Sequence, residues 1–417
     1  MHADWERVSL NPGDVEVPPW ADSAHAAQNS VATGEIDLLQ ARRIALALHP
    51  DLEVVRAKAG IAGAGAAWAQ LLRDPELSAE LLRIREDVPD PWVAAIGLEA
   101  EVPLWGKRAA RRDLAAAELQ LAQAEVFAAE WQVWCDVGSA WLDWAIAEKR
   151  RQVAAAYLER IAQLTPQVAR WADLGEVARS EADLFALAQA QAEVELQTQR
   201  DQIAQSRRHL IAAMGLAPVA SPAFASDPAE PVADFALAEE PLEVRRLRLA
   251  YELREQRLRQ AILGQYPDLS VGPALESDGG QFRLGVLGGF PIPLWNRNRQ
   301  AIAVAEAERT LARAEFERGC KQAESHRADL AALRITLEQR GNELAQRVRP
   351  LTTSLVEQAV RQVRIGEASP LVLLEALSRQ YAVEMQILDT RAAWSAVEIE
   401  WQRVHSPMPA EEPQTNQ

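Results

Sequence analysis

The chain carries the tripeptide Pro-Leu-Trp twice, and this repetition limits its possible folds more than any other feature. The two copies are Pro103-Leu104-Trp105 and Pro293-Leu294-Trp295. Each copy follows an alternating apolar segment and precedes a basic turn and a long Ala-rich run. The landmarks before and after it, including Gly175 and Gly366, recur in the same order at an offset of about 190 residues. The pattern predicts a tandem duplication of one structural unit that covers most of the 417 residues.

Each predicted repeat contains a helix, a β-hairpin, a long helix and a return helix. The first repeat is placed at 36–216, with its hairpin at 76–104, its long helix at 107–172 and its return helix at 180–214. The second is placed at 241–405, with its hairpin at 268–294, its long helix at 299–364 and its return helix at 370–404. Outside the repeats we expect an extended N-terminal segment at 1–35, a Pro- and Ala-rich linker at 217–240 and a disordered tail at 406–417.

The strands are predicted from period-two alternation, which is clearest in 92–102 and 282–292. The partner strands are placed at 76–85 and 268–276. Strands of about ten residues with alternating polarity suit a tilted membrane barrel, but about eight strands are needed to close one. Four strands must therefore lie on a soluble surface or be completed by other copies of the chain.

The long helices are predicted from two adjacent heptad stripes, rich in small residues, that favour packing on neighbours at both sides. A helix of about 66 residues would span about 100 Å, far more than a compact domain needs. Pro166 lies inside the first long helix and should kink or interrupt it. Pro350 lies at a nearby position of the second and could mark the same change of direction.

Composition and residue spacing argue against several classes of function. The net charge of −16 disfavours a nucleic-acid partner. The six histidines are scattered, and Cys135 and Cys320 are expected to be small core residues, so no metal site or cofactor is predicted. The sequence has no phosphate-binding loop and no nucleophile elbow, and we therefore expect no enzyme. It also has no run of 18 apolar residues for a transmembrane helix.

In its tandem repeat of helix, hairpin, long helix and return helix, the chain resembles the TolC-like outer-membrane efflux proteins over roughly residues 36–405. The segment 36–59 looks like the opening helix of that family, and the tandem unit and the two glycine-containing reversals are similar to it. The stretch "PIPLWNRNRQAIAVAEAER" at 291–309 is similar to the cobalt–zinc–cadmium (CzcC-like) branch. The resemblance implies a mainly α homotrimer with a small β part. Three chains would form a twelve-stranded outer-membrane β-barrel continuous with a periplasmic α-helical barrel.

This resemblance also implies a function and a set of partners. The chain would be the passive outer-membrane channel of a tripartite RND-type efflux system, exporting metal cations or organic compounds. Its partners would be a periplasmic adaptor (membrane fusion) protein, an inner-membrane RND pump reached through that adaptor, and outer-membrane lipid. The first twenty residues show no secretion signal, which leaves open a misassigned start, a mature or engineered form, or a relic.

Site residues follow from matching positions in that family. The reversals at 173–183 and 364–375 would be periplasmic tips that meet the adaptor. The tip residues are Arg170, Asp173, Gly175, Glu176, Arg179, Asp183, Arg364, Gly366 and Glu367. The strand-to-helix junctions are Pro103, Leu104, Trp105, Pro293, Leu294, Trp295 and Asn296. Glu99 and Glu101 would line the lumen or stand at the extracellular rim.

The alternative is a soluble coiled-coil scaffold or interaction protein without transport activity. It would share the long helices, the heptads and the acidic surface, and its alternating segments would be accidental. Two features favour the channel instead: the duplicated alternating segments, and tryptophans near their ends that suit a membrane-interface belt. These tryptophans are Trp92, Trp105 and Trp295.

Overall fold

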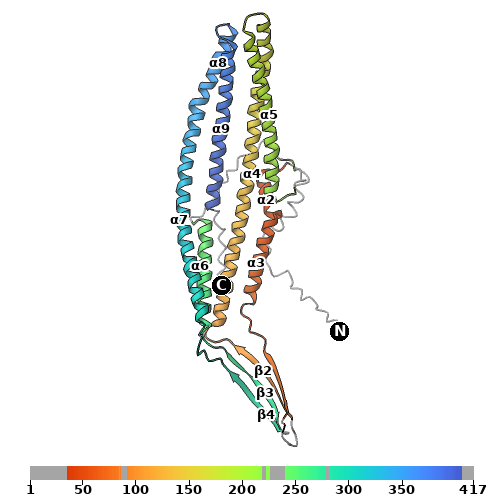
Figure 1. Cartoon of the computed structure of the whole chain (residues 1–417), viewed down its shortest axis with the longest axis vertical. Helices are drawn as coiled ribbons and strands as arrows, with labels where there is room; N and C mark the ends of the chain where they lie inside the picture. Colours follow the sequence, from red (N-terminus) through yellow and green to blue (C-terminus); the bar gives the residue numbers. More distant parts are fainter. Residues whose placement is uncertain are drawn as a thin grey trace, which may run out of the picture. The chain divides into compact units, whose positions relative to one another are not determined.

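The computed structural model describes residues 35–83, 85, 92–217, 222–225, 240–278 and 281–405, which form long helices and one small sheet (Figure 1). The helices before the linker are α2 (Leu38–Leu48), α3 (Pro50–Trp68), α4 (Lys107–Asp173) and α5 (Arg179–Ala213). Those after it are α6 (Leu242–Leu263), α7 (Arg299–Glu343), α8 (Arg349–Arg364) and α9 (Pro370–His405). The strands are β1 (Glu76–Arg83), β2 (Trp92–Val102), β3 (Leu269–Asp278) and β4 (Gln281–Gly289).

Several sequence predictions fall outside the described residues. The N-terminal segment 1–35 lies there except for its last residue, and so does the tail 406–417. Of the linker 217–240, only residue 217, the short piece 222–225 and residue 240 are described. None of the helices in the described ranges contains a stretch long and apolar enough to cross a membrane.

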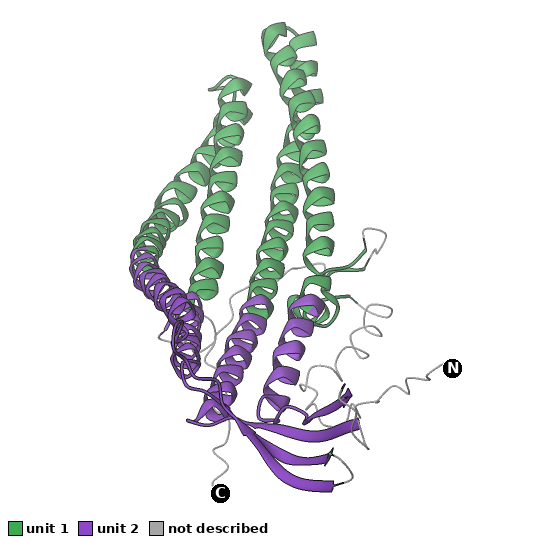
Figure 2. Cartoon of the chain, turned by 60° about the horizontal axis from the view of Figure 1, so that its bottom comes forward, with its two compact units in different colours: residues 1–52, 130–238, 326–417 green, residues 53–129, 239–325 purple. Residues whose placement is uncertain are grey.

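The chain divides into two compact units, coloured in Figure 2. Unit 1 comprises residues 1–52, 130–238 and 326–417, and unit 2 comprises residues 53–129 and 239–325. Unit 1 therefore holds both helical reversals, at 173–179 and 364–370, whereas unit 2 holds the sheet and the helix ends that join it. Tip and junction residues thus lie in different units, and each unit is described by itself below.

The sheet in unit 2 is antiparallel with the order β1-β2-β3-β4, so β1 and β4 are its edges. The alternation in the sequence places β2 at residues 92–102, and the strand has these bounds. Its apolar positions, such as Ile96 and Leu98, are exposed, whereas the alternate position Gly97 is buried. On one face of β4 the apolar side chains are almost fully exposed: Phe282 85%, Leu284 79% and Val286 78%. A sheet with open edges and an exposed apolar face needs further partners.

Two strands approach each other closely at Gly272 of β3. A Cβ atom at this position would collide with the backbone carbonyl of Leu98 on β2. Regular pairing is interrupted at the same point, since Gly97 pairs with Ala274 and the next pair is Ala100 with Val271. Only glycine fits such a close backbone contact.

Helix α4 runs through Pro166 without a break, so of the two predicted effects the interruption is wrong and the kink stays a prediction. A proline inside a helix removes one hydrogen bond and costs about 3 kcal/mol. The hydroxyl of Thr165 donates to the carbonyl oxygen of Ile161 at 2.9 Å. Ile161 and Val168, on either side of the proline, are fully buried. Packing of these side chains holds the helix in place because it outweighs the loss of one bond.

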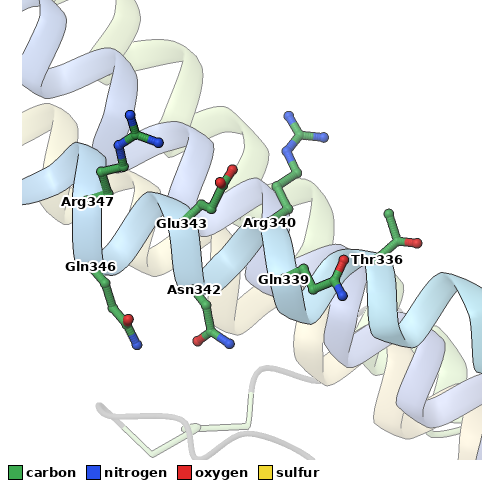
Figure 3. A pocket seen from close by; sticks show the side chains of 7 residues that line it. All are labelled: Thr336, Gln339, Arg340, Asn342, Glu343, Gln346 and Arg347. Atoms are coloured by element: carbon green, nitrogen blue, oxygen red, sulfur yellow. The ribbon is translucent and has the colours of Figure 1, made fainter.

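The second long helix, expected to be continuous over 299–364, contains a five-residue π-helical turn at Leu344–Val348. The N–H of Arg349 donates to the carbonyl oxygen of Leu344, five residues earlier. Pro350 follows directly and has no N–H for the usual bond to the preceding turn, which explains why the helix widens here. Figure 3 shows the polar side chains around this turn, which line a surface hollow of about 640 Å³. All of them belong to one helical stretch, so no opposing element closes the hollow.

Aromatic side chains of α4 hold the described part of the linker in unit 1. The rings of Trp141 and Trp144 lie 5.9 and 5.3 Å from the ring of Phe224. Arg207 donates to the carbonyl oxygen of Pro222 at 2.7 Å. The segment 222–225 is therefore packed on the helices by ring contacts and one charged hydrogen bond.

The opening segment 36–59 is two helices rather than one. His49 has extended backbone angles because it precedes Pro50, which begins α3. In α2, the guanidinium of Arg42 is buried and donates to the carbonyl oxygen of Trp134 at 3.2 Å. Burial lowers the pKa of Arg42 to about 10. Arg42 thus joins α2 to α4 inside unit 1.

The two cysteines differ in burial. Cys135 is fully buried in α4, whereas Cys320 in α7 is only partly buried, and both are free thiols. Burial raises the pKa of the Cys135 thiol to about 12. The expectation of a small core residue therefore holds in full for Cys135 and in part for Cys320.

Candidate functional site

The first helical reversal in unit 1 is built on Gly175. Helix α4 ends at Asp173, and the N–H of Glu176 donates to the carbonyl oxygen of Trp171 at 2.9 Å. The N–H of Gly175 donates to the carbonyl oxygen of Ala172 at 3.1 Å. These two bonds form a Schellman cap, which needs the left-handed backbone that Gly175 adopts, with φ of +77°.

The second reversal has the same construction around Gly366, whose φ is +74°. The N–H of Glu367 donates to the carbonyl oxygen of Gln362 at 2.9 Å, and that of Gly366 donates to Val363 at 3.2 Å. In both reversals a Cβ on the glycine would meet no atom within 4 Å. Backbone conformation, and not lack of space, therefore favours glycine at these two positions.

The two reversals share a groove of about 670 Å³ within unit 1. Its lining includes Trp171, Gly175, Glu176, Glu181, Arg364, Gly366, Glu367, Ser369 and Pro370. The hydroxyl of Ser369 donates to the carboxylate of Glu181 at 2.9 Å, which connects the start of α9 to α5. Five of the predicted tip residues thus lie in one groove, namely Gly175, Glu176, Arg364, Gly366 and Glu367.

The other four predicted tip residues do not line this groove. Arg179 and Asp173 form an exposed ion pair at 3.8 Å, and Arg170 donates to the carbonyl oxygen of Pro166 at 3.2 Å. Asp183 is exposed on α5. The prediction missed Trp171, Glu181 and Ser369. No spacing rule pairs Glu181 with Ser369, because Glu181 lies in α5 and Ser369 lies directly before α9.

A stacked tyrosine pair joins three helices of unit 1 farther from the reversals. The rings of Tyr157 on α4 and Tyr381 on α9 lie 4.7 Å apart. The Tyr381 hydroxyl donates to the carboxylate of Glu195 on α5 at 3.2 Å. Burial, and then the adjacent Glu195 carboxylate, raise the pKa of Tyr381, so its hydroxyl remains a donor at neutral pH. Arg160 also donates to Gln380, at 2.9 Å.

In unit 2, the first strand-to-helix junction is fixed by contacts within the chain. Trp105 has a left-handed backbone, and its ring lies 5.5 Å from that of Tyr266. The ammonium group of Lys107 lies 2.8 Å from the carboxylate of Asp268 and donates to the carbonyl oxygen of Tyr266 at 2.7 Å. The side chains of Lys107 and Asp268 are only 13% and 15% exposed, so this pair is shielded from solvent.

The contribution of the Lys107–Asp268 ion pair to the stability of the fold can be tested by removing its carboxylate. Burial favours the neutral carboxyl of Asp268, but the hydrogen bond and charge of Lys107 outweigh it and hold the pKa below 3.8. The contribution to stability is therefore complete at neutral pH and is lost as the pH falls below 3.8. We expect Asp268→Ala to cost about 2 kcal/mol of unfolding free energy at pH 7, because it leaves Lys107 buried and unpaired.

Denaturant unfolding of the full chain in detergent measures this cost. The matched control is Glu276→Ala, which breaks the exposed ion pair of Glu276 with Arg283 at 3.8 Å. It should cost less than about 0.5 kcal/mol. Equal losses for the two variants would contradict the special role of Asp268.

The second junction also departs from regular backbone geometry. Arg297 and Asn298 have left-handed backbones, with φ of +45° and +55°. The amide of Asn298 donates to the carbonyl oxygen of Ala261 at 2.7 Å and fixes this turn against the end of α6. Trp295 projects outward and is 88% exposed. The predicted junction residue Asn296 accepts a hydrogen bond from the N–H of Arg299 at 2.9 Å, and Asn298, which the prediction did not include, makes the side-chain bond to α6.

Glu99 and Glu101 lie on the less exposed face of β2. Glu101 accepts a hydrogen bond from Arg73 at 2.8 Å. Glu99 pairs in register with Glu76 of β1, which brings two carboxylates to neighbouring strands. Both acids therefore belong to the sheet face opposite the exposed apolar side chains.

Comparisons with known proteins identify the fold. No protein-family model matches the chain, and no curated protein matches its sequence. The outer membrane protein VceC from Vibrio cholerae is 19% identical, with a TM-score of 0.73 over 88% of this chain and 95% of that one. CusC, whose structures describe transmembrane channel formation, is 16% identical with a TM-score of 0.73, over 89% and 92%. The Campylobacter jejuni CmeC outer membrane channel is 14% identical with a TM-score of 0.71, over 88% and 84%. The chain therefore has the mainly helical fold, with a small antiparallel sheet, of these outer-membrane proteins.

Proposed function

We propose that the chain is the outer-membrane channel of a tripartite RND-type efflux system. The observation that carries this proposal is the four-stranded sheet, which has two open edges and an almost fully exposed apolar face on β4. Three copies would supply twelve strands, four from each chain, enough to close a barrel. The likeness in fold to outer-membrane channels supports the same conclusion.

In such a trimer the helices would continue the channel into the periplasm. At about 1.5 Å per residue, the 67 residues of α4 correspond to about 100 Å of helix. Each of the two repeats would contribute one hairpin and one long helix, so each chain would supply two hairpins and two long helices to the channel. The channel would be a passive conduit without enzymatic activity, resident in the outer membrane and in contact with its lipid.

The groove between the reversals is the proposed contact with a periplasmic adaptor protein, which would connect the trimer to an inner-membrane RND pump. The groove presents Glu176, Glu367 and Arg364 beside the apolar ring of Trp171. The acids Glu99 and Glu101 would face the lumen, since the apolar side chains of β2 occupy the other face. A lumen lined by carboxylates favours cations, and heavy-metal cations are the proposed substrates of this cobalt–zinc–cadmium-type channel.

The soluble-scaffold alternative requires that the alternating segments form no sheet. The structure contains that sheet, with three antiparallel strand pairings. Burying its exposed apolar face is needed to avoid aggregation. The sheet therefore favours the channel over the scaffold.

The test is expression of the full chain with an export signal, followed by extraction from membranes in mild detergent. We expect a species of about 138 kDa of protein, three times the 46.0 kDa chain, in the outer-membrane fraction. Expression in a host that lacks its own channel should then raise resistance to cobalt, zinc or cadmium. A soluble monomer would refute the channel, and resistance to organic compounds alone would refute only the metal substrate.

A further inference from the structure

The two strand-to-helix junctions of unit 2 share the Pro-Leu-Trp sequence but differ in what their side chains contact. At the first junction the aromatic ring and both cations have partners within the chain. Trp105 contacts Tyr266, Lys107 binds Asp268, and Arg108 donates to the carbonyl oxygen of Gln70 at 3.1 Å. Both cations of this junction are therefore already bound within the chain, although Trp105 is still 61% exposed.

At the second junction the tryptophan projects into solvent, and Arg297, which aligns with Lys107, bonds a backbone carbonyl instead of a carboxylate. Trp295 is 88% exposed, and Leu294 and Ile292 beside it are 62% and 65% exposed. Arg297 donates from its Nε to the carbonyl oxygen of Pro293 at 3.3 Å. Within the described part of the chain, neither Arg297 nor Arg299 forms an ion pair with a carboxylate.

The turn that carries these side chains has a defined backbone conformation. The Asn298 amide is anchored on the carbonyl oxygen of Ala261, and a Cβ on Gly264 would lie only 2.6 Å from that amide nitrogen. The two left-handed residues, Arg297 and Asn298, therefore lie in a turn held by packing against the end of α6. Arg297 and Arg299 stand two positions apart on it, next to the exposed Trp295.

We infer that this junction, residues 292–299, binds the phosphate of an anionic phospholipid head group. A tryptophan with adjacent apolar side chains suits the membrane–water interface, and guanidinium groups bind phosphate with two parallel hydrogen bonds. Phe290, between β4 and this junction, is also 61% exposed, so exposed apolar side chains follow one another along the chain from β4 to Trp295. This inference rests on the proposed function, because it requires the apolar strand face to contact lipid. It adds that each protomer binds lipid at its second junction and not at its first.

Native mass spectrometry of the full-length protein in neutral detergent tests the inference, with phosphatidylglycerol and phosphatidylcholine added as probes. We expect the wild-type chain to retain phosphatidylglycerol in preference to phosphatidylcholine, with one lipid per protomer. Arg297→Gln together with Arg299→Gln should weaken phosphatidylglycerol binding about thirtyfold, from the gain expected per basic residue at an anionic surface. Inorganic phosphate in excess should not displace the lipid, because the apolar contacts also contribute.

The matched control is Arg200→Gln together with Arg208→Gln, which removes two exposed arginines from α5 in unit 1. This control should bind lipid like the wild type. Unchanged lipid binding in the Arg297/Arg299 variant, or no preference for phosphatidylglycerol in the wild type, would overturn the inference. Loss of the oligomer in that variant would also overturn it, because the arginines would then serve a neighbouring copy. The assay needs no transport, so failure of export without loss of lipid binding would refute the proposed function alone.

Discussion

Replacing Gly272 by alanine is expected to prevent the chain from forming oligomers in the outer membrane. A Cβ at this position would collide with the carbonyl of Leu98, which is backbone and cannot rotate away. The collision would separate β2 from β3, and those strands join the two hairpins of the sheet. Because the pairing of β2 with β3 joins the two hairpins into one sheet, we expect at least a tenfold loss of oligomer.

The measurement is the amount of oligomer in the outer-membrane fraction, compared at equal expression. Gly285→Ala on β4 is the matched control, since a Cβ there would meet nothing within 4 Å. This control should assemble like the wild type. If Gly272→Ala assembles equally well, the close approach of β2 and β3 is not a requirement of the fold.

A second large effect is expected at the helical reversals. Gly175→Val together with Gly366→Val should leave oligomers intact but reduce export to the level of cells without the channel. Both glycines have left-handed backbones, at +77° and +74°, which cost a side-chain-bearing residue about 1–2 kcal/mol each. Valine would therefore change the path of both reversals and with it the groove proposed to contact the adaptor.

Resistance of a host without its own channel measures this effect, alongside the amount of oligomer. The control is Gly175→Asn together with Gly366→Asn, because asparagine tolerates the left-handed conformation and fits the open space. The asparagine variant should retain most of the export. Full resistance with valine at both positions would show that the reversals are not needed, and equal damage from asparagine would exclude backbone conformation as the cause.

Much of the fold follows from local sequence signals. The bounds of β2 agree with the alternation at 92–102, since side-chain direction in a strand is set by period two alone. The reversals follow from glycine after a long periodic helix. The break at His49 also has a local signal in Pro50, although the family resemblance suggested one opening helix over 36–59.

The remaining features depend on contacts between distant parts of the chain. The ion pair of Lys107 with Asp268 joins residues far apart in the sequence, and no periodicity pairs them. The same is true of Ser369 and Glu181 in the groove. At Pro166 the local sequence predicts a break in the helix, but α4 continues because Ile161 and Val168 are buried against other parts of the chain. Sequence reasoning identified the segments that form the candidate site better than it identified the side chains that interact in it.

The π-helical turn at Leu344–Val348 changes the phase of the helix that contains it. One extra residue in a turn rotates every later side chain by about 100° around the helix axis. In α8 the buried side chains are Val356 and Ala359, which pack with Leu373, Ala376 and Leu377 of α9. Helix α9 is a neighbour on both sides of the turn, since Arg334 pairs with Glu398 before it and Arg349 pairs with Glu384 after it. Deleting a single residue there should rotate Val356 and Ala359 by about 100° and turn them away from α9.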